Sequence, residues 1–167
     1  MLNPPILSGE PFLTGHDGEY VWSIQAAQAG QTRNVLLQPA TRYRLDFLGG
    51  IGRFGSDYFL SVSLIAVDDL QSLPLENQPG VRRLAITQGM QVPPESHGTM
   101  LPYSLEYTTA EVLPPELDGK YIGIHMYGSD GFPRVNYDDF RLTATRLPEP
   151  KALTLLLTCL FVSRHRR

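Results

Sequence analysis

The chain has 167 residues, of which 19% are charged and 42% are hydrophobic, and its formal net charge at pH 7 is −3. This balance is typical of a globular domain and excludes a disordered chain, because the apolar fraction is large enough to form a core. The acidic excess argues against a nucleic-acid partner, since binding to phosphates needs a surplus of Lys and Arg.

The N-terminal part of the chain is predicted to be a loop followed by two short strands. Residues 1–18 are rich in Pro and Gly and show no periodicity, so we interpret them as a loop that is the remnant of a truncated first strand. They contain no basic stretch followed by an apolar one, so no secretory signal peptide is expected in them. Residues 19–25 alternate apolar and polar side chains through Trp22, which predicts a half-buried strand. A second short strand is expected at residues 32–38.

The clearest strand signal lies at residues 41–47. Tyr43, Leu45 and Phe47 alternate there with charged residues. Alternation with charge on the outer side predicts one wall of an antiparallel sheet. Residues 57–67 follow the same pattern. Three more strands are predicted further along the chain, at residues 81–88, 101–109 and 120–127.

The last predicted strand, residues 134–145, changes phase in its middle. Val135 and Tyr137 share one phase, whereas Phe140 and the apolar residues after it share the opposite one. Two phases in one strand require an extra residue, so we predict a β-bulge at Asp138-Asp139.

Together these elements predict an all-β fold. About eight strands, no helix before the C-terminal tail and a turn signal between each pair of strands are typical of an antiparallel β-sandwich, in particular a jelly roll, over residues 19–146. The expected core consists of apolar residues in the inward phase of each strand: Tyr43, Leu45, Phe47, Leu60, Val62, Leu64, Leu105, Ile122, Ile124, Phe140 and Leu142.

The C-terminal segment, residues 147–167, differs in composition from the rest. It begins with Pro148-Glu149-Pro150, continues with an apolar run and ends in a basic cluster that includes Arg164, Arg166 and Arg167. Its net charge is +3, which leaves −6 for the domain. Apolar residues surround the predicted helix on most sides, so we expect it to enter a membrane rather than dock on the domain as an ordinary amphipathic helix.

This arrangement resembles the PEP-CTERM sorting signal of exported bacterial proteins. The resemblance implies that a sorting protease recognises Pro148, Glu149 and Pro150, that the helix enters the inner membrane transiently, and that the mature protein is exported to the cell surface or extracellular matrix. Such a protein is expected to have an N-terminal signal peptide, so we expect the true start of the protein to lie upstream.

The domain carries a second, weaker resemblance. Residues 35–47 look like the "LxPGTxYxLxF" segment of exported PEP-CTERM proteins, and residues 119–124 with 135–142 look like their "GxxLxI…VNFDNVRL" ending. The same ending is similar to galactose-binding-like jelly rolls and carbohydrate-binding modules. In such modules the acid at the Asp138 position often helps to hold a structural calcium, so the resemblance implies a calcium ligand at Asp138.

Calcium needs six to eight oxygen ligands, and the acidic first strand that supplies a partner in similar modules is not visible here. Glu10 and Glu19 are poor substitutes. The alternative is that Asp138 and Asp139 satisfy the backbone of the bulge and that the protein holds no cofactor. Both interpretations stay open.

Exposed aromatic side chains are the candidates for binding polysaccharide, because sugar rings stack on them. Phe54 and Phe132 lie in Gly-rich loops, where an aromatic residue is not automatically buried, and Tyr127 ends a predicted strand. Trp22 is a further candidate, although its phase favours the core.

No sequence motif for catalysis occurs in the chain. There is no Gly-x-Ser-x-Gly, no His-Glu-x-x-His and no phosphate-binding loop, and the histidines show no metal-ligand spacing. The sequence therefore predicts a non-catalytic exported sandwich that binds polysaccharide. The alternatives are a structural matrix protein without a small ligand and, less favoured, a glycan-active enzyme.

Overall fold

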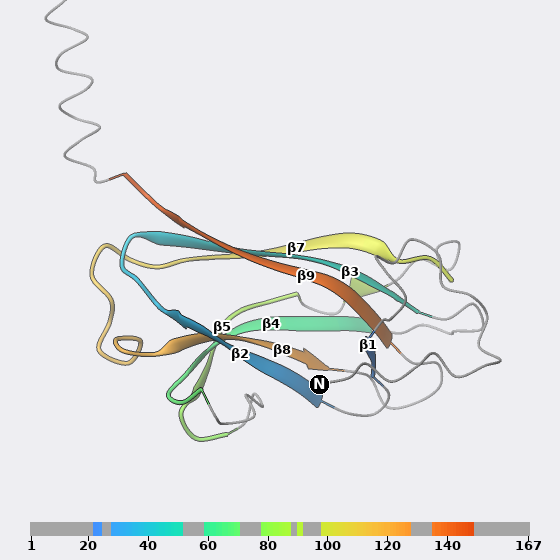
Figure 1. Ribbon diagram of the computed structural model, residues 1–167, viewed down its shortest axis with the longest axis horizontal. Helices are drawn as coiled ribbons and strands as arrows, with labels where there is room; N and C mark the ends of the chain where they lie inside the picture. Colours follow the sequence, from blue (N-terminus) through green and yellow to red (C-terminus); the bar gives the residue numbers. More distant parts are fainter. Residues whose placement is uncertain are drawn as a thin grey trace, which may run out of the picture.

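A computed structural model describes residues 22–24, 28–51, 59–70, 78–87, 90–91, 98–127 and 135–148, with side chains for all but 22–24, 59–60 and 90–91. Over these residues the fold is all-β, with two antiparallel sheets that face each other and no helix (Figure 1). The predicted antiparallel sandwich is thus confirmed, whereas the predicted C-terminal helix lies outside the described residues.

The first sheet has the order β1-β9-β3-β7. Its strands are Trp22–Ile24 (β1), Val135–Arg146 (β9), Thr41–Ile51 (β3) and Leu101–Thr108 (β7). β3 lies inside this sheet and pairs with β9 and β7 along most of its length. It is also the strand with the clearest alternation in the sequence.

The second sheet has the order β2-β8-β4-β5, and β6 pairs with β4. Its strands are Gln28–Leu36 (β2), Tyr121–Tyr127 (β8), Phe59–Val67 (β4), Val81–Ile86 (β5) and Met90–Gln91 (β6). Seven strands of the described chain have six or more residues, and β1 and β6 are short. The expected number was about eight.

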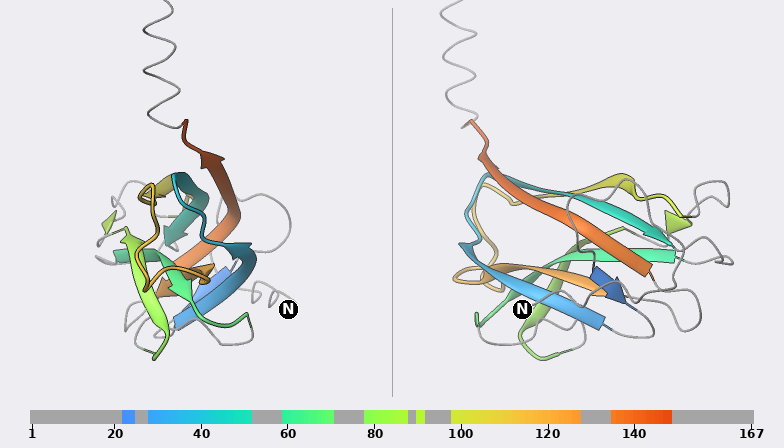
Figure 2. Two further views of the ribbon diagram at one scale, coloured as in Figure 1. Left: turned by 90° about the vertical axis from the view of Figure 1, so that its left-hand side faces the viewer. Right: turned by 45° about the vertical axis from the view of Figure 1, so that its right-hand side comes forward.

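The chain crosses between the sheets repeatedly. From β1 to β4, and again from β7 to β9, each strand lies in the opposite sheet from the one before it. Neighbouring strands therefore come from distant parts of the sequence, as in β1 with β9 and β2 with β8. The end view in Figure 2 shows the two layers that result.

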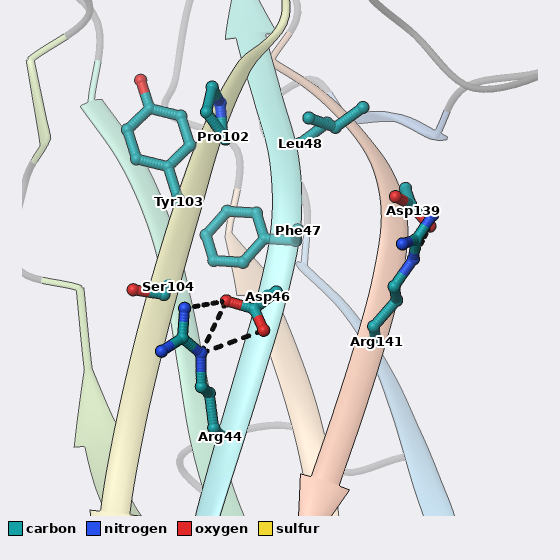
Figure 3. A pocket seen from close by; sticks show the side chains of 9 residues that line it. All are labelled: Arg44, Asp46, Phe47, Leu48, Pro102, Tyr103, Ser104, Asp139 and Arg141. Carbon is teal, nitrogen blue, oxygen red and sulfur yellow. Dashed lines mark hydrogen bonds and ion pairs between the residues drawn. The ribbon is translucent and has the colours of Figure 1, made fainter.

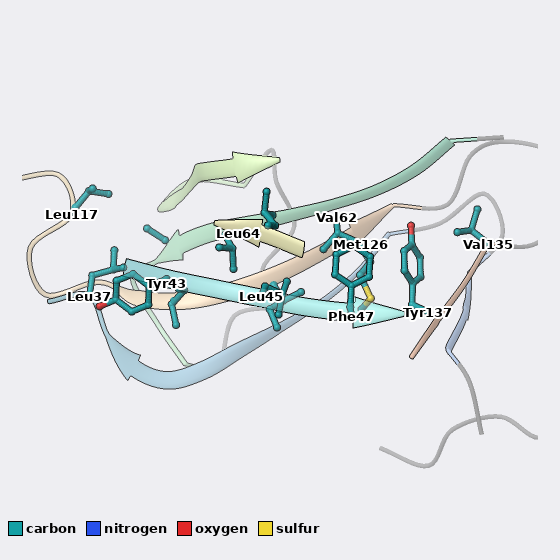
Figure 4. Close-up of a cluster of buried hydrophobic side chains, with 14 of the residues drawn as sticks. Leu37, Tyr43, Leu45, Phe47, Val62, Leu64, Leu117, Met126, Val135 and Tyr137 are labelled. Carbon is teal, nitrogen blue, oxygen red and sulfur yellow. The ribbon is translucent and has the colours of Figure 1, made fainter. Parts of the chain in front are cut away.

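The core lies between the two sheets. Tyr43 and Leu45 of β3 are fully buried and face Val62 and Leu64 of β4, which are also fully buried (Figure 4). Of the eleven predicted core residues, eight are buried, Phe140 and Leu142 are partly buried against the core, and the side chain of Leu60 is not described. Alternation along the strands therefore identified the core face correctly.

The predicted bulge in β9 is present. Leu48 of β3 is opposite Asp138, but Asp46 is opposite Arg141, so β9 has one residue more than β3 in this interval. Asp139 has a φ of 49°, the left-handed conformation that a bulge residue often adopts. The extra residue lets the rings of Tyr137 and Phe140 both pack toward the core, with their centroids 6.2 Å apart.

Tyr137 joins the two sheets through its hydroxyl group. The hydroxyl donates to the carbonyl of Tyr127, at 2.9 Å, and accepts a hydrogen bond from the amide of Ser61, at 3.2 Å. Both partners belong to the second sheet, whereas Tyr137 belongs to the first. Burial raises the pKa of this phenol well above its ordinary value, so the group stays neutral and can keep both contacts.

Three details differ from the sequence-based expectation. The second strand covers Gln28–Leu36 rather than residues 32–38, and β6 lies inside an expected loop. Ile65, which alternation assigned to the outer face, is fully buried. A strand covered on both faces loses the polar alternation that marks an exposed side.

Within the described part of the chain, no helix has the length and hydropathy needed to cross a membrane.

Candidate functional site: a cleft between the two sheets

A cleft of about 200 Å³ opens between the two sheets where β9 faces β2 and β8. We call it the inter-sheet cleft. Its walls combine long polar side chains from β2, apolar side chains from β8 and the bulge of β9. The lining residues are Gln31, Arg33, Ile124, Met126, Asp138, Asp139 and Phe140.

The cleft exists because strand pairing is interrupted beside it in both sheets, at β9 in the first and at β2 in the second. β1 pairs with β9 only over residues 135–137, and no described strand covers that side of β9 beyond Tyr137. On the other side, β2 follows β8 regularly only as far as Thr32 and regains its register at Leu36. The edges of the two sheets therefore do not close over the core at this point.

The floor of the cleft is apolar. Ile124 and Met126 of β8 are 2% and 3% exposed. Phe140 of β9 is partly buried and stacks on Phe47, with ring centroids 5.5 Å apart. Ligand sites are usually enclosed by apolar and aromatic side chains with a few convergent polar groups. The floor offers such a surface to a small flat ligand.

Two carboxyl groups lie at the β9 side of the cleft. Asp138 is 9% exposed. The side chain of Asp139 is 24% exposed, and its carboxylate accepts a hydrogen bond from the guanidinium of Arg141 at 2.7 Å. The bulge thus brings an acidic group to the border of an apolar surface. The sequence predicted the bulge but assigned no site to it other than calcium.

A second hollow, the outer-face groove, lies on the solvent side of the first sheet and has a volume of about 360 Å³ (Figure 3). Arg44 pairs there with Asp46 and Glu106, and Arg141 pairs with Asp139. Its charged side chains therefore have partners already, and most of them are well exposed. The smaller inter-sheet cleft, with its buried floor, is the better candidate for a ligand.

The aromatic residues predicted from the sequence do not form this site. Tyr127 is half-buried at the end of β8 and does not line either hollow. Phe54 and Phe132 lie outside the described residues, as does the side chain of Trp22. Pro148 is exposed just beyond β9. The other sorting residues, Glu149, Pro150, Arg164, Arg166 and Arg167, also lie outside the described part.

The described residues bring no metal-binding cluster to Asp138. Among them, no three His, Cys, Asp or Glu side chains are grouped so that they could hold a metal ion. Glu10 and Glu19 are not described. Calcium at Asp138 therefore gains no support from the geometry of the described residues.

Three residues of the cleft were missed by sequence reasoning: Gln31, Arg33 and Met126. Met126 lies in the inward phase of the strand predicted at residues 120–127, in agreement with its burial, but no site was assigned to it. Gln31 was placed before the second strand and Arg33 near its start, because the strand boundary was set too late. The sequence contained only a weak signal for Gln31 and Arg33. Both lie in the same phase as Ala29, which packs against the core.

Comparison with known proteins finds no matching family model and no curated protein with a similar sequence. Among solved structures, a cyclase from Fischerella sp. TAU matches with a TM-score of 0.62 and 20% identity, over 84% of this chain and 72% of that one. The same source provides a cyclase in complex with 4-(1H-indol-3-yl)butan-2-one, with a TM-score of 0.61, 20% identity and coverages of 88% and 74%. A Stig cyclase in complex with (3Z)-3-(1-methyl-2-pyrrolidinylidene)-3H-indole matches with a TM-score of 0.61 and 18% identity, over 84% and 72%.

At this level of identity the likeness shows a shared fold. It nevertheless corrects the prediction of a non-catalytic surface or matrix protein that binds polysaccharide. That prediction inferred the lack of an enzyme from the lack of catalytic motifs, whereas the similar solved structures named above are cyclases.

Proposed function

We propose that this domain is an enzyme of the cyclase type that binds a small aromatic ligand in the inter-sheet cleft. The observation that carries the proposal is the position of Asp138 beside the apolar floor of Ile124, Met126 and Phe140. Two of the structurally similar cyclases were crystallised with indole compounds, which are flat, apolar and carry few polar groups. A ligand of that class suits the floor of this cleft.

The floor would bind the ligand mainly by burying its apolar surface. Removal of apolar surface from water is worth about 25 cal/mol per Å². Met126 adds a polarizable sulfur, which makes favourable contacts with aromatic rings. The cleft, at about 200 Å³, is smaller than the roughly 300–1,000 Å³ of pockets for drug-sized ligands. The ligand is therefore expected to be small.

Asp138 is the better candidate for proton transfer. It is 9% exposed, whereas the side chain of Asp139 is 24% exposed, so Asp138 is the carboxyl group more shielded from water. A carboxyl group at Asp138 can protonate an unsaturated carbon of the bound ligand, and the resulting cation is stabilised by the carboxylate that remains. A double bond or ring of the same ligand then forms the new carbon–carbon bond, and a proton returns to the carboxylate. The product is an isomer of the substrate, so no further reactant is required.

Binding of 4-(1H-indol-3-yl)butan-2-one, followed by two-dimensional NMR, tests the site. The proposal expects the amide signals of Ile124, Met126 and Phe140 to shift, and Met126→Ala to weaken binding. Asp46→Asn, in the outer-face groove, serves as the control and should leave binding unchanged. Absence of binding, or shifts confined to the outer-face groove, would show that the cleft is not a ligand site.

Activity is tested with an indole that carries an alkenyl side chain. Mass spectrometry after chromatography should detect a cyclised product with the mass of the substrate. Asp138→Asn should lower the rate by about 10²–10⁴, the usual contribution of a general acid, while the indole ketone still binds. Equal rates in the wild type and the variant would remove Asp138 from the mechanism.

We also propose that residues 147–167 are a sorting signal that directs the domain out of the cell through the inner membrane. The sequence supports this proposal through its Pro-Glu-Pro motif, apolar run and terminal arginines. In cells that contain the matching sorting protease, mass spectrometry should find an exported protein that lacks the arginine cluster. Replacement of Pro148-Glu149-Pro150 by three alanines should leave the precursor in the membrane. An exported protein with an intact C-terminus would refute the assignment.

A further inference from the structure

The β2 side of the inter-sheet cleft contains two polar residues where a sandwich usually has apolar ones. Gln31 and Arg33 line the cleft and lie in the same phase as Ala29, which packs against the core. Core-facing positions of sandwich strands are normally apolar. Gln31 is exposed and Arg33 is half-buried, so both side chains can reach solvent and the apolar floor.

Neither side chain has a partner within the described part of the chain. No acidic residue there pairs with Arg33, and neither Gln31 nor Arg33 takes part in a side-chain hydrogen bond. Arg44 and Arg82 differ in this respect, because Arg44 pairs with Asp46 and Glu106, and Arg82 pairs with Glu116. A ligand could therefore bind the guanidinium of Arg33 without breaking an ion pair to any described residue.

The positive and negative groups of the cleft come from different sheets. Arg33 belongs to β2 of the second sheet, whereas Asp138 and Asp139 belong to β9 of the first, and Ile124 and Met126 of β8 line the same cleft. A ligand carboxylate beside Asp138 would be repelled, whereas one beside Arg33 would form charge-assisted hydrogen bonds. The polarity of the cleft thus allows only one orientation of an anionic ligand.

We propose that Arg33, assisted by Gln31, recognises a carboxylate on the ligand and thereby orients the apolar, reacting part toward Asp138. The assignment rests on the proposed function of the cleft and names its substrate class: a small aromatic molecule with one carboxylate at the end of a short chain. Arg33 is a specificity-determining residue in this arrangement, because it distinguishes ligands by a group that does not react.

Three compounds with the same indole ring and similar chain lengths test the proposal. They are 4-(1H-indol-3-yl)butanoic acid, the ketone 4-(1H-indol-3-yl)butan-2-one and 3-butylindole. Calorimetry with the full chain at pH 7 should give the lowest Kd for the acid, a higher one for the ketone and the highest for the alkane. Arg33→Gln should weaken binding of the acid about tenfold, as expected for the loss of a charge-assisted contact, and leave the Kd of the alkane unchanged.

Two variants control the experiment. Arg33→Lys keeps the charge and should keep part of the preference for the acid. Arg44→Gln removes an arginine of the outer-face groove and should have no effect on any of the three compounds. A preference for the acid that disappears in Arg44→Gln and persists in Arg33→Gln would place the carboxylate in the other hollow and overturn the proposal.

The outcomes separate this inference from the proposed function. If the ketone and the alkane bind in the cleft but the acid binds no more tightly, the role of Arg33 is wrong and the aromatic site stands. If none of the three compounds binds, the proposed function fails, and the inference fails with it. Unchanged melting temperatures of the variants show that a loss of binding does not result from unfolding.

Discussion

Substitution of a single side chain, that of Leu45, tests how the two sheets pack on each other. Leu45 is fully buried in the middle of β3 and belongs to the core that both sheets share. Leu45→Ala should lower the free energy of unfolding by about 2–5 kcal/mol, because it removes buried methyl groups and leaves a cavity. Urea denaturation followed by circular dichroism measures this loss.

Arg42→Ala provides the matched control on the same strand. Arg42 is exposed on the opposite face of β3, and substitutions at such surface positions usually change stability by less than about 0.5 kcal/mol. A similar loss in the two variants would contradict the assignment of the inner and outer faces of β3.

At the scale of single residues, the sequence predicted burial better than function. Tyr43, Leu45 and Phe47 were identified as core because their neighbours are charged and mark the outer face. Arg33 could not be assigned in the same way. Its proposed role depends on Asp138 and Met126, which line the same cleft but lie much further along the chain. Spacing along one strand contains no information about that proximity.

At the scale of secondary structure, the bulge of β9 is the feature on which the cleft depends. Asp139 has a positive φ, which Asn and Gly also adopt readily but β-branched residues adopt only with strain. Asp139→Asn should therefore keep the fold, and Asp139→Val should destabilise it by about 1–2 kcal/mol or more. Thermal unfolding of the two variants measures the difference.

Deletion of Asp139 is the stronger form of the same test. Without the extra residue, Tyr137 and Phe140 cannot both face the core, because a one-residue shift moves every following side chain to the other face. The deletion variant should lose cooperative unfolding or fail to fold. A stable variant with native NMR dispersion would show that the bulge is dispensable.

Most strands were predictable, and the exceptions have a physical reason. β3, β7, β8 and β9 were predicted within a few residues of their observed ends, since each presents one polar and one apolar face over much of its length. β2 was displaced because it is an edge strand whose register with β8 shifts between Thr32 and Leu36. Edge strands with polar residues in both phases give little alternation. The same irregularity opens the cleft, so the site lies where the sequence pattern was weakest.

At the scale of the whole molecule, the buried tyrosines should make the free energy of unfolding decrease at alkaline pH. Burial raises the pKa of Tyr43, Tyr103 and Tyr137, whereas a tyrosine in the unfolded chain ionises near a pKa of about 10. Above that pH the unfolded chain releases protons that the native protein retains, so the unfolded state is favoured. Stability is expected to be independent of these groups below about pH 9 and to fall as the pH rises through about 10.

Urea denaturation at a series of pH values between neutral and strongly alkaline tests this dependence. Tyr137→Phe should be less stable at neutral pH, because it loses the hydrogen bonds to Ser61 and Tyr127. Its stability should fall less steeply with rising pH, since one of the three phenols is absent. Parallel curves for the variant and the wild type would contradict a role of Tyr137 in the alkaline transition.

The order of the strands has a consequence for the synthesis of the protein. β9 lies between β1 and β3, and β8 lies between β2 and β4. The first four described strands therefore have no neighbours among themselves. β4 can pair with β5 and β6, and β3 with β7, once those strands are made, whereas β1 and β2 find their partners only in the C-terminal third of the chain. Pairing over such sequence separations is slow, because long loops must close before the contacts form. The nascent domain can thus form part of each sheet early, whereas β1 and β2 stay without a paired strand until the last two long strands arrive.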